Sequence, residues 1–477
     1  MHYTFSSLLS AATILTQTFL CEVDTDTWPN EYTSMANMFQ TVPEIENLTL
    51  TFQNPGNIPS WVNGDYFVVG PGRYEWGDST YKGFLDANAI TSKITIRNGG
   101  DESENSVLKF DRKFIKSKTW EWNSEYNDIV VSEFATYAEP KDLVPHPKKI
   151  VESMVQRMSY YSAHVSDNTI VKINELFGQM IAFGESPSIN ILHRDTLETV
   201  SHLDINRAMP DGVLLLTQTA HGYFDKDTNT FLNPATVLDL SSPSGIPKPA
   251  YIVLKFNNAD QVFSLEQLAE NPDIILDQIE VSDLIYATEH NQITDAKFQY
   301  AQYFHTVLVT QDYLTIPLTN VALEPVTCAV TSVGTARPLG DCYCLDDDLE
   351  GILIVLDKRS LQEVGRFRMD YLVAFHEINV FQMESDKDII VVDCMNAAEG
   401  GNPFSIFPLE VINATGTELV EKYYDYMMGT VPAKLTLDLN GEKDEWGLMK
   451  ATRELMMEGA VDNLEWMNYK ALGEHGF

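Results

Sequence analysis

Residues 303–317 read YFHTVLVTQDYLTIP, and a histidine stands near the start of this otherwise apolar run. Val307, Val309 and residues 314–316 suit a β-strand, because β-branched and aliphatic side chains pack well on a pleated sheet. His305 stands where a strand would favour another hydrophobic residue, so its imidazole needs a polar partner. A lone histidine of this kind is most often a core residue with one hydrogen bond.

Similar apolar runs recur from about residue 58 onward, and turn residues separate them. They include DYFVVGPG (65–72), SKITIRNG (92–99), DIVVSEFATY (128–137), NTIVKINELFG (168–178), ILIVLDKRSL (352–361) and DIIVVDCMN (388–396). Runs of this length and spacing are typical of an all-β sandwich, barrel or propeller. The chain lacks a fixed repeat, so a propeller would have to be of a divergent kind.

Two segments carry helical periodicity instead. In KKIVESMVQRMSYY (148–161) the apolar side chains fall on one face, which predicts an amphipathic helix. That face could pack on the protein's own core or touch a membrane surface. The second segment, EWGLMKATRELMMEG (445–459), is expected to form a helix packed on the body of the protein.

The composition limits the classes of partner. Lys and Arg number 32 and Asp and Glu number 69 among 477 residues, a formal net charge of −37. Such a surface repels nucleic-acid phosphates, so we expect no nucleic-acid partner. Hydrophobic residues make up 44% of the chain, which is enough for a sizeable core and excludes a disordered chain.

The N-terminal segment resembles a targeting sequence. Residues 1–21 are almost uncharged, with an apolar centre too short for a membrane span, so we expect a cleaved signal peptide. Residues 22–44 would then form an N-terminal extension. We expect the protein in the secretory pathway or outside the cell, where it could also associate with a membrane. In that setting Asn47 and Asn413 are candidate glycan acceptors. Four cysteines would remain and could form disulfides: Cys328, Cys342, Cys344 and Cys394.

Two further histidines share the setting of His305. His221 lies in LLLTQTAHGYFDKD and His376 in MDYLVAFHEINVF, each after a short apolar stretch. They are too far apart for one helix or hairpin, so they could meet only in a fold that returns to a common axis. Converging imidazoles without thiolates suit iron, copper or zinc. The H-x-D spacing of HRD (193–195) is expected to lie in an exposed turn, so His193 is not expected to bind metal.

The order of several motifs resembles that of the carotenoid cleavage oxygenase family. The matching stretches run from about residue 55 to 469: NIPSWVNGDYFVVGPGRYEWGD, LKFDRKFIKS, FGESPSINILHRDTLETV, TAHGYFDKD, YFHTVLVTQDYLTIP, AFHEINVF with DIIVVDC, and LEWMNY. They are most similar to the animal branch, which holds the β-carotene oxygenases and the retinal pigment epithelium retinoid isomerase.

That resemblance implies an all-β, seven-bladed β-propeller over residues 45–477 with a few helical excursions. It also implies a non-haem Fe(2+) on the propeller axis. The family's TAH, YVHS and FHHIN motifs place iron ligands at His221, His305 and His376. The family also has glutamates that hydrogen-bond to the ligand imidazoles and orient them, and these match Glu185 and Glu465.

The implied reaction is oxidative cleavage of a carotenoid or apocarotenoid double bond by dioxygen, giving two carbonyl products. Tyr303, two residues before a ligand, would form a wall of the substrate tunnel. Because a carotenoid is insoluble in water, the helix expected at 148–161 would supply peripheral membrane contact.

The chain departs from the family pattern in two places. The family's fourth iron histidine lies about a hundred residues beyond the motif matched by LEWMNY, and the EHGF sequence at His475 only superficially resembles it. We therefore expect a C-terminally incomplete propeller. FLDANAI (84–90) replaces a glycine-containing turn of the family. These departures favour the alternatives of a catalytically impaired, secreted carotenoid- or retinoid-binding protein; a retinoid isomerase is a third possibility.

Overall fold

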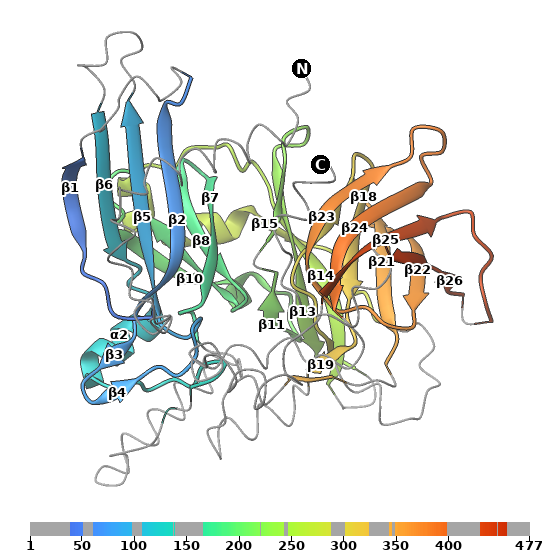
Figure 1. The fold of residues 1–477 in the computed structure, drawn as a ribbon, viewed down its shortest axis with the longest axis horizontal. Coiled ribbons are helices and arrows are strands. Elements are labelled where there is room, and N and C mark those ends of the chain that lie inside the picture. Colours follow the sequence, from blue (N-terminus) through green and yellow to red (C-terminus); the bar gives the residue numbers. More distant parts are fainter. Residues whose placement is uncertain are drawn as a thin grey trace, which may run out of the picture.

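The computed structural model describes a mostly β protein, as the spacing of the apolar runs predicted. The described residues are 39–50, 61–97, 107–136, 138, 166–219, 221–242, 247–287, 301–323, 343–345, 349–397, 430–445 and 447–455. Figure 1 shows the blue β1–β6 sheet at one end of the molecule, the green strands β7–β14 in the middle and the orange and red strands β21–β26 at the other end.

The first sheet has the strand order β1-β6-β5-β2 and is antiparallel throughout. Its strands are β1 (Ile45–Leu50), β2 (Gly64–Arg73), β5 (Asn88–Arg97) and β6 (Val107–Phe114). The small hairpin of β3 (Glu75–Trp76) and β4 (Ser79–Thr80) lies beside it in sequence, and helix α2 (Lys118–Tyr126) follows β6.

Helix α2 has well-defined ends. The Ser117 side chain accepts a hydrogen bond from the Trp120 backbone N–H at the helix start, and Asn127 adopts a left-handed conformation (φ 49°) at its end. These are favourable cap residues, since Ser satisfies a free N–H and Asn tolerates positive φ.

The second sheet is an antiparallel meander in the order β10-β9-β8-β7. It consists of β7 (Ile170–Leu176), β8 (Gln179–Gly184), β9 (Ser188–Leu192) and β10 (Thr199–Asp204). Every residue of β8 and β9 is buried, which explains why their sequences read as continuous rather than alternating apolar runs.

The third sheet combines β11, β13, β14 and β15, with β12 paired to β13. Its bounds are β11 (Val213–Gln218), β12 (Tyr223–Asp225), β13 (Thr230–Asp239), β14 (Lys248–Phe256) and β15 (Ile279–Val281). Short helices lie around it: η5 (Ile205–Ala208), α4 (Leu265–Glu270) and η6 (Pro272–Gln278).

Three further sheets complete the described fold, in the orders β16-β19-β20, β17-β18-β21-β22-β26 and β23-β24-β25-β27. Their bounds are β16 (Ala301–Gln302), β17 (Leu308–Val309), β18 (Tyr313–Leu318), β19 (Val321–Leu323), β20 (Tyr343–Leu345), β21 (Gly351–Asp357), β22 (Glu363–Met369), β23 (Ala374–Gln382), β24 (Ile389–Ala397), β25 (Thr430–Asp438), β26 (Met449–Lys450) and β27 (Thr452–Leu455).

Successive sheets pack face to face through apolar clusters. The rings of Phe183 in β8, Phe231 in β13 and Phe256 in β14 contact one another with centroids 5.0–6.1 Å apart. The third sheet packs on the β17–β22 sheet in the same way, through Val253 and Ile316 among others. This stacking brings the ends of strands from different sheets to one region, where the candidate site lies.

The helix expected at 445–459 is wrong over the part that the structure describes. Met449 pairs with Phe367 in a parallel bridge, and 452–455 pair with β25. Cross-strand pairing therefore overrides the helical periodicity of this segment. The amphipathic segment 148–161 and the signal peptide expected at 1–21 lie outside the described residues.

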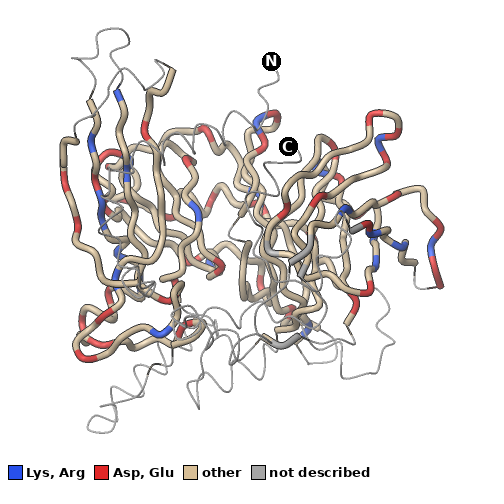
Figure 2. Tube along the Cα trace, in the orientation of Figure 1, with Lys and Arg blue, Asp and Glu red and all other residues tan. Residues whose placement is uncertain are grey.

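The acidic side chains are spread over the described chain, mostly on turns and strand ends (Figure 2). Within the residues that the structure describes, no helix is both long and apolar enough to cross a membrane.

Candidate metal centre

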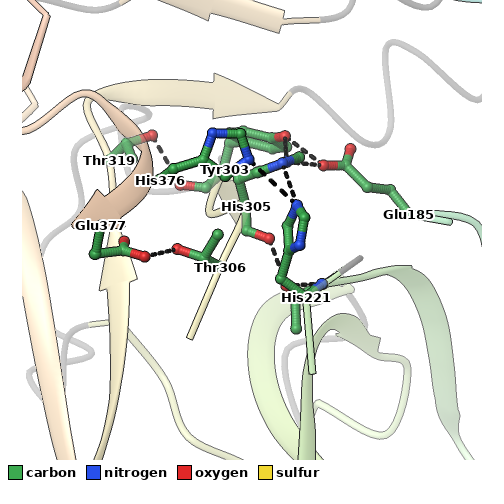
Figure 3. Close-up of polar contacts among 9 residues, drawn as sticks. Glu185, His221, Tyr303, His305, Thr306, Thr319, His376 and Glu377 are labelled. Atoms are coloured by element: carbon green, nitrogen blue, oxygen red, sulfur yellow. Dashed lines mark hydrogen bonds and ion pairs between the residues drawn. The ribbon is translucent and has the colours of Figure 1, made fainter. Parts of the chain in front are cut away.

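Three histidines from distant segments of the chain converge at one point. His221 follows β11, His305 lies between β16 and β17, and His376 is in β23. A ring nitrogen from each lies within 4.8 Å of one from each of the others. The Nε2 atom of His221 lies 3.0 Å from Nε2 of His305 and 3.3 Å from Nε2 of His376 (Figure 3).

Backbone contacts hold the first two histidines side by side. His221 forms an isolated parallel bridge with Thr306. The Thr219 hydroxyl donates a hydrogen bond to the carbonyl oxygen of His305 and accepts one, at 3.1 Å, from the backbone N–H of His221. The spacing of these two imidazoles is therefore set by the backbone as well as by their side-chain torsions.

A glutamate orients the ring of His305. The Nδ1 atom of His305 lies 2.6 Å from Oε1 of Glu185, the residue that follows β8. The Tyr303 hydroxyl donates to the same oxygen at 2.5 Å. Because a carboxylate accepts hydrogen bonds, Nδ1 carries the proton and Nε2 of His305 presents a lone pair to the other two histidines. Tyr303 is thus tied to Glu185.

The environment of His221 and His376 favours the neutral imidazole. Burial, together with the neighbouring His305, His376 and Lys172, lowers the pKa of His221 to about 3. Burial, followed by the proximity of His305, also lowers the pKa of His376. A neutral imidazole is the form that binds a metal ion.

The spacing of the nitrogens fits a shared metal ion. Two nitrogens each about 2.1 Å from a metal lie about 3.0–3.4 Å apart for bond angles between square and tetrahedral values. The two Nε2 distances at His221 fall within that range. Since Nε2 of His305 carries no proton, a cation among the three nitrogens also removes the repulsion between lone pairs. Imidazole ligation without thiolate suits iron, zinc or copper.

The other sequence candidates lie away from this cluster or outside the described residues. His193 sits in the turn after β9, where its Nδ1 accepts a hydrogen bond from the Thr196 backbone N–H at 3.0 Å. Glu465 and His475 are not among the described residues. Within 84–90 no residue has a positive φ, so alanine and asparagine there need no glycine-like backbone.

The structure describes only some of the candidate glycan acceptors and disulfide cysteines. Asn47 is exposed in β1, and Asn413 lies outside the described residues. Cys394 is a buried free thiol in β24. Cys328 and Cys342 also lie outside the part that the structure describes, so the possible disulfides stay a prediction.

Sequence reasoning missed three residues that support the cluster. Thr219 contacts His221 and His305 as described above, and Thr306 donates to Oε2 of Glu377 at 2.5 Å. Each of these residues is one or two positions from a histidine. That proximity was the available signal, but it does not reveal which side chains face one another across sheets.

The fold and the cluster together define a β-sheet protein with a candidate histidine metal centre. The model of the retinal pigment epithelial membrane protein (RPE65) family matches residues 38–458. The chain therefore belongs to this family, as the order of its motifs predicted.

Curated relatives agree with that assignment. The chain is 23% identical over 392 residues to a mitochondrial carotenoid-cleaving dioxygenase of Macaca fascicularis and 24% identical over 364 residues to the β,β-carotene 15,15′-dioxygenase of Mus musculus. It is also 23% identical over 338 residues to the carotenoid isomerooxygenase of Galleria mellonella. These alignments cover 81%, 75% and 71% of this chain but 62%, 56% and 57% of the relatives.

Solved structures share the fold at low identity. An ACO/RPE65 chimera, where ACO is apocarotenoid oxygenase, superposes with a TM-score of 0.57 at 14% identity over 88% of this chain and 71% of that chain. Cobalt-substituted ACO of Synechocystis gives a TM-score of 0.56 at 13% identity, with the same coverage of each chain. At such identity these matches bear on the fold alone.

Proposed function

We propose that the protein is an iron-dependent dioxygenase that cleaves one double bond of a carotenoid or apocarotenoid into two carbonyl products. The observation that carries this proposal is the convergence of His221, His305 and His376, with Glu185 orienting one of them. The names of the curated relatives, which are carotenoid-cleaving dioxygenases, support the substrate class. Both oxygen atoms of one dioxygen molecule enter the two products, so the reaction needs no further oxidant or reductant.

The three histidines would hold Fe(2+). When bound, this ion supplies the redox chemistry that lets dioxygen react with an alkene. Burial keeps the imidazole of His221 neutral, and Glu185 fixes the Nδ1–H tautomer of His305. Tyr303, bonded to Glu185, limits the movement of that carboxyl group.

The fold proposed for this function is a seven-bladed β-propeller over residues 45–477. The four-stranded meander of β7–β10 is a typical propeller blade, and the face-to-face packing of successive sheets is the packing expected between blades. The histidines would then lie toward a common axis, each from a distant segment of the chain.

Peripheral membrane contact is part of the proposal, because a carotenoid substrate partitions into lipid. The amphipathic pattern of residues 148–161 supports that segment as the contact. Charged replacements on its apolar side, at Val151 and Val155, are expected to reduce binding to liposomes. Unchanged binding would indicate that the segment packs on the protein's own core instead.

Incubation of iron-loaded protein with β-carotene under oxygen tests the proposed reaction. We expect apocarotenoid aldehydes, detected by chromatography and mass spectrometry. Substrate recovered intact with a shifted absorption band would indicate a binding protein instead. Conversion of a retinoid ester without oxygen consumption would indicate an isomerase.

A further inference from the structure

Beside the three histidines lies a second pair of side chains that the proposed function does not use. The Thr306 hydroxyl donates a hydrogen bond to Oε2 of Glu377 at 2.5 Å. Thr306 directly follows His305, and Glu377 directly follows His376. Figure 3 shows this contact apart from the histidine rings. Each of the two segments thus contributes one residue to the cluster and one to the pair.

The arrangement agrees with the alternation of side chains in an extended chain, and the register of β23 shifts on either side of Glu377. Neighbouring side chains in an extended segment point to opposite sides. When His305 and His376 meet on one side, the residues that follow them meet on the other. The two segments are therefore connected on both sides, and a shift of one along the other would break the Thr306–Glu377 hydrogen bond as it moved the imidazoles apart.

Thr306 connects all three histidine segments. Its backbone forms the parallel bridge with His221, its side chain bonds Glu377 next to His376, and it is covalently joined to His305. Thr306 is 6% exposed, so water competes little for its hydroxyl. Hydrogen bonds from a hydroxyl to a carboxylate are short and strong, which suits them to fixing a distance.

The chemistry of the pair is particular to this chain's sequence. Glu377 stands where the FHHIN motif quoted above has a second histidine. Its carboxyl group lies within hydrogen-bond distance of Thr306, and it does not belong to the group of possible ligand atoms that lie within 4.8 Å of one another, which the three histidines form. Glu377 is therefore not a fourth ligand of this group.

We propose that Thr306 and Glu377 are positioning residues that set the spacing of the three histidines for metal binding. This inference rests on the proposed metal centre. It predicts that loss of the hydrogen bond lowers metal affinity even when the fold is kept.

The test measures Co²⁺ affinity of the full chain by equilibrium dialysis, together with the melting temperature of the metal-free protein. Thr306→Val removes the hydroxyl and keeps the shape of the side chain. We expect it to weaken Co²⁺ binding by about 10- to 100-fold, the usual effect of losing a residue that supports a ligand. Thr306→Ser keeps the hydroxyl but loses the methyl group, and its Co²⁺ affinity is expected to stay within about threefold of that of the unmodified protein. If side-chain volume alone mattered, this smaller side chain would weaken Co²⁺ binding more than Thr306→Val does.

Thr310→Val is the matched control. Thr310 is 9% exposed, and its hydroxyl bonds within the β17–β18 turn: it donates to the Tyr313 carbonyl oxygen at 3.4 Å and accepts from the Tyr313 backbone N–H at 3.1 Å. We expect unchanged Co²⁺ affinity. Equal weakening by Thr310→Val and Thr306→Val would overturn the inference, because the effect would then be general destabilisation.

Substitution of the acceptor gives an independent measurement if Thr306→Val does not fold. Glu377→Ala is expected to weaken Co²⁺ binding as Thr306→Val does, whereas Glu377→Gln keeps an acceptor oxygen and is expected to retain affinity. Unchanged affinity in Glu377→Ala overturns the positioning role. Failure of the unmodified protein to bind Co²⁺ overturns the metal centre itself, so the two failures are distinguishable.

Discussion

The Nδ1 atom of His305 lies 2.6 Å from Oε1 of Glu185, although 120 residues separate the two in sequence. The contact joins the end of β8 in the second sheet to the segment before β17. It assigns the proton of His305 to Nδ1 and directs the lone pair of Nε2 toward His221 and His376. The stacking of the sheets thus determines the tautomer of a candidate ligand.

Glu185→Gln is predicted to reduce metal affinity by about 10- to 100-fold, because an amide is a weaker and less basic partner for the Nδ1–H of His305. Isothermal titration with Co²⁺ measures the change. Glu175→Gln, at an exposed residue of β7 that pairs with Arg194, is the control and should leave affinity unchanged. Equal affinity in all three proteins would contradict the orienting role of Glu185.

His193→Ala is predicted to leave metal content unchanged, since His193 caps a turn and is absent from the cluster. Losing the hydrogen bond from the Thr196 backbone N–H should cost about 0.5–1.5 kcal/mol of unfolding free energy. Metal analysis and urea denaturation check the two parts. A large loss of bound metal would mean that the HRD segment contributes a ligand.

A buried carboxyl cluster predicts an unusual pH dependence of stability. Glu133 and Asp86 are 1% and 0% exposed. Burial raises the pKa of Asp86 to about 6, and burial together with the nearby Asp86 charge raises the pKa of Glu133 well above its usual value. Both groups therefore hold protons more tightly in the folded than in the unfolded state. Their contribution to stability is fully present below about pH 4 and is lost as pH rises through the folded pKa values.

Glu133→Gln resembles the protonated acid, and its amide oxygen can still accept from Asn168, which donates to Oε1 at 2.8 Å. The variant should therefore gain stability relative to the unmodified protein as pH rises from about 4 to 8, by about 1.4 kcal/mol for each unit of pKa shift removed. Urea denaturation across that range measures the difference. Glu125→Gln, on an exposed residue of α2, is the control. A difference that stays constant with pH would show that Glu133 ionises normally.

Lys358→Met is predicted to cost about 3 kcal/mol of unfolding free energy, because it leaves the buried carboxylate of Asp225 without its cation. The Lys358 ammonium lies 3.3 Å from Oδ2 of Asp225, and the two side chains are 5% and 4% exposed. Urea denaturation measures the loss. Lys226→Met, beside Asp225 but exposed, should change stability by less than about 0.5 kcal/mol. Equal stability of the two variants would show that the Lys358–Asp225 ion pair does not stabilise the junction of β12 and β21.

The sequence was informative about the cluster because each histidine interrupts an apolar run, where an imidazole is unusual. Their convergence could be argued from the common setting of His221, His305 and His376. The matched motif predicted that Glu185 orients a ligand histidine, but not which one. The contact between Thr306 and Glu377 could not be predicted, because it depends on which sides of two distant segments face each other.

The errors in secondary structure have a similar origin. Residues 445–459 have helical periodicity, but the partners β22 and β25 make strands of 449–450 and 452–455. Helix α2 was missed because KTWEWNSEY has no clear apolar face, although its cap, Ser117, was a readable signal. Periodicity describes one segment at a time, whereas strand pairing depends on residues far away in sequence.

The iron content of purified protein tests the account most directly. The account predicts a single iron for each chain of the unmodified protein, and no iron in the His221→Ala/His305→Ala/His376→Ala variant, whose circular dichroism should remain that of a β protein. Iron bound in the triple variant at the level of the unmodified protein would contradict the assignment of the metal centre to these three histidines.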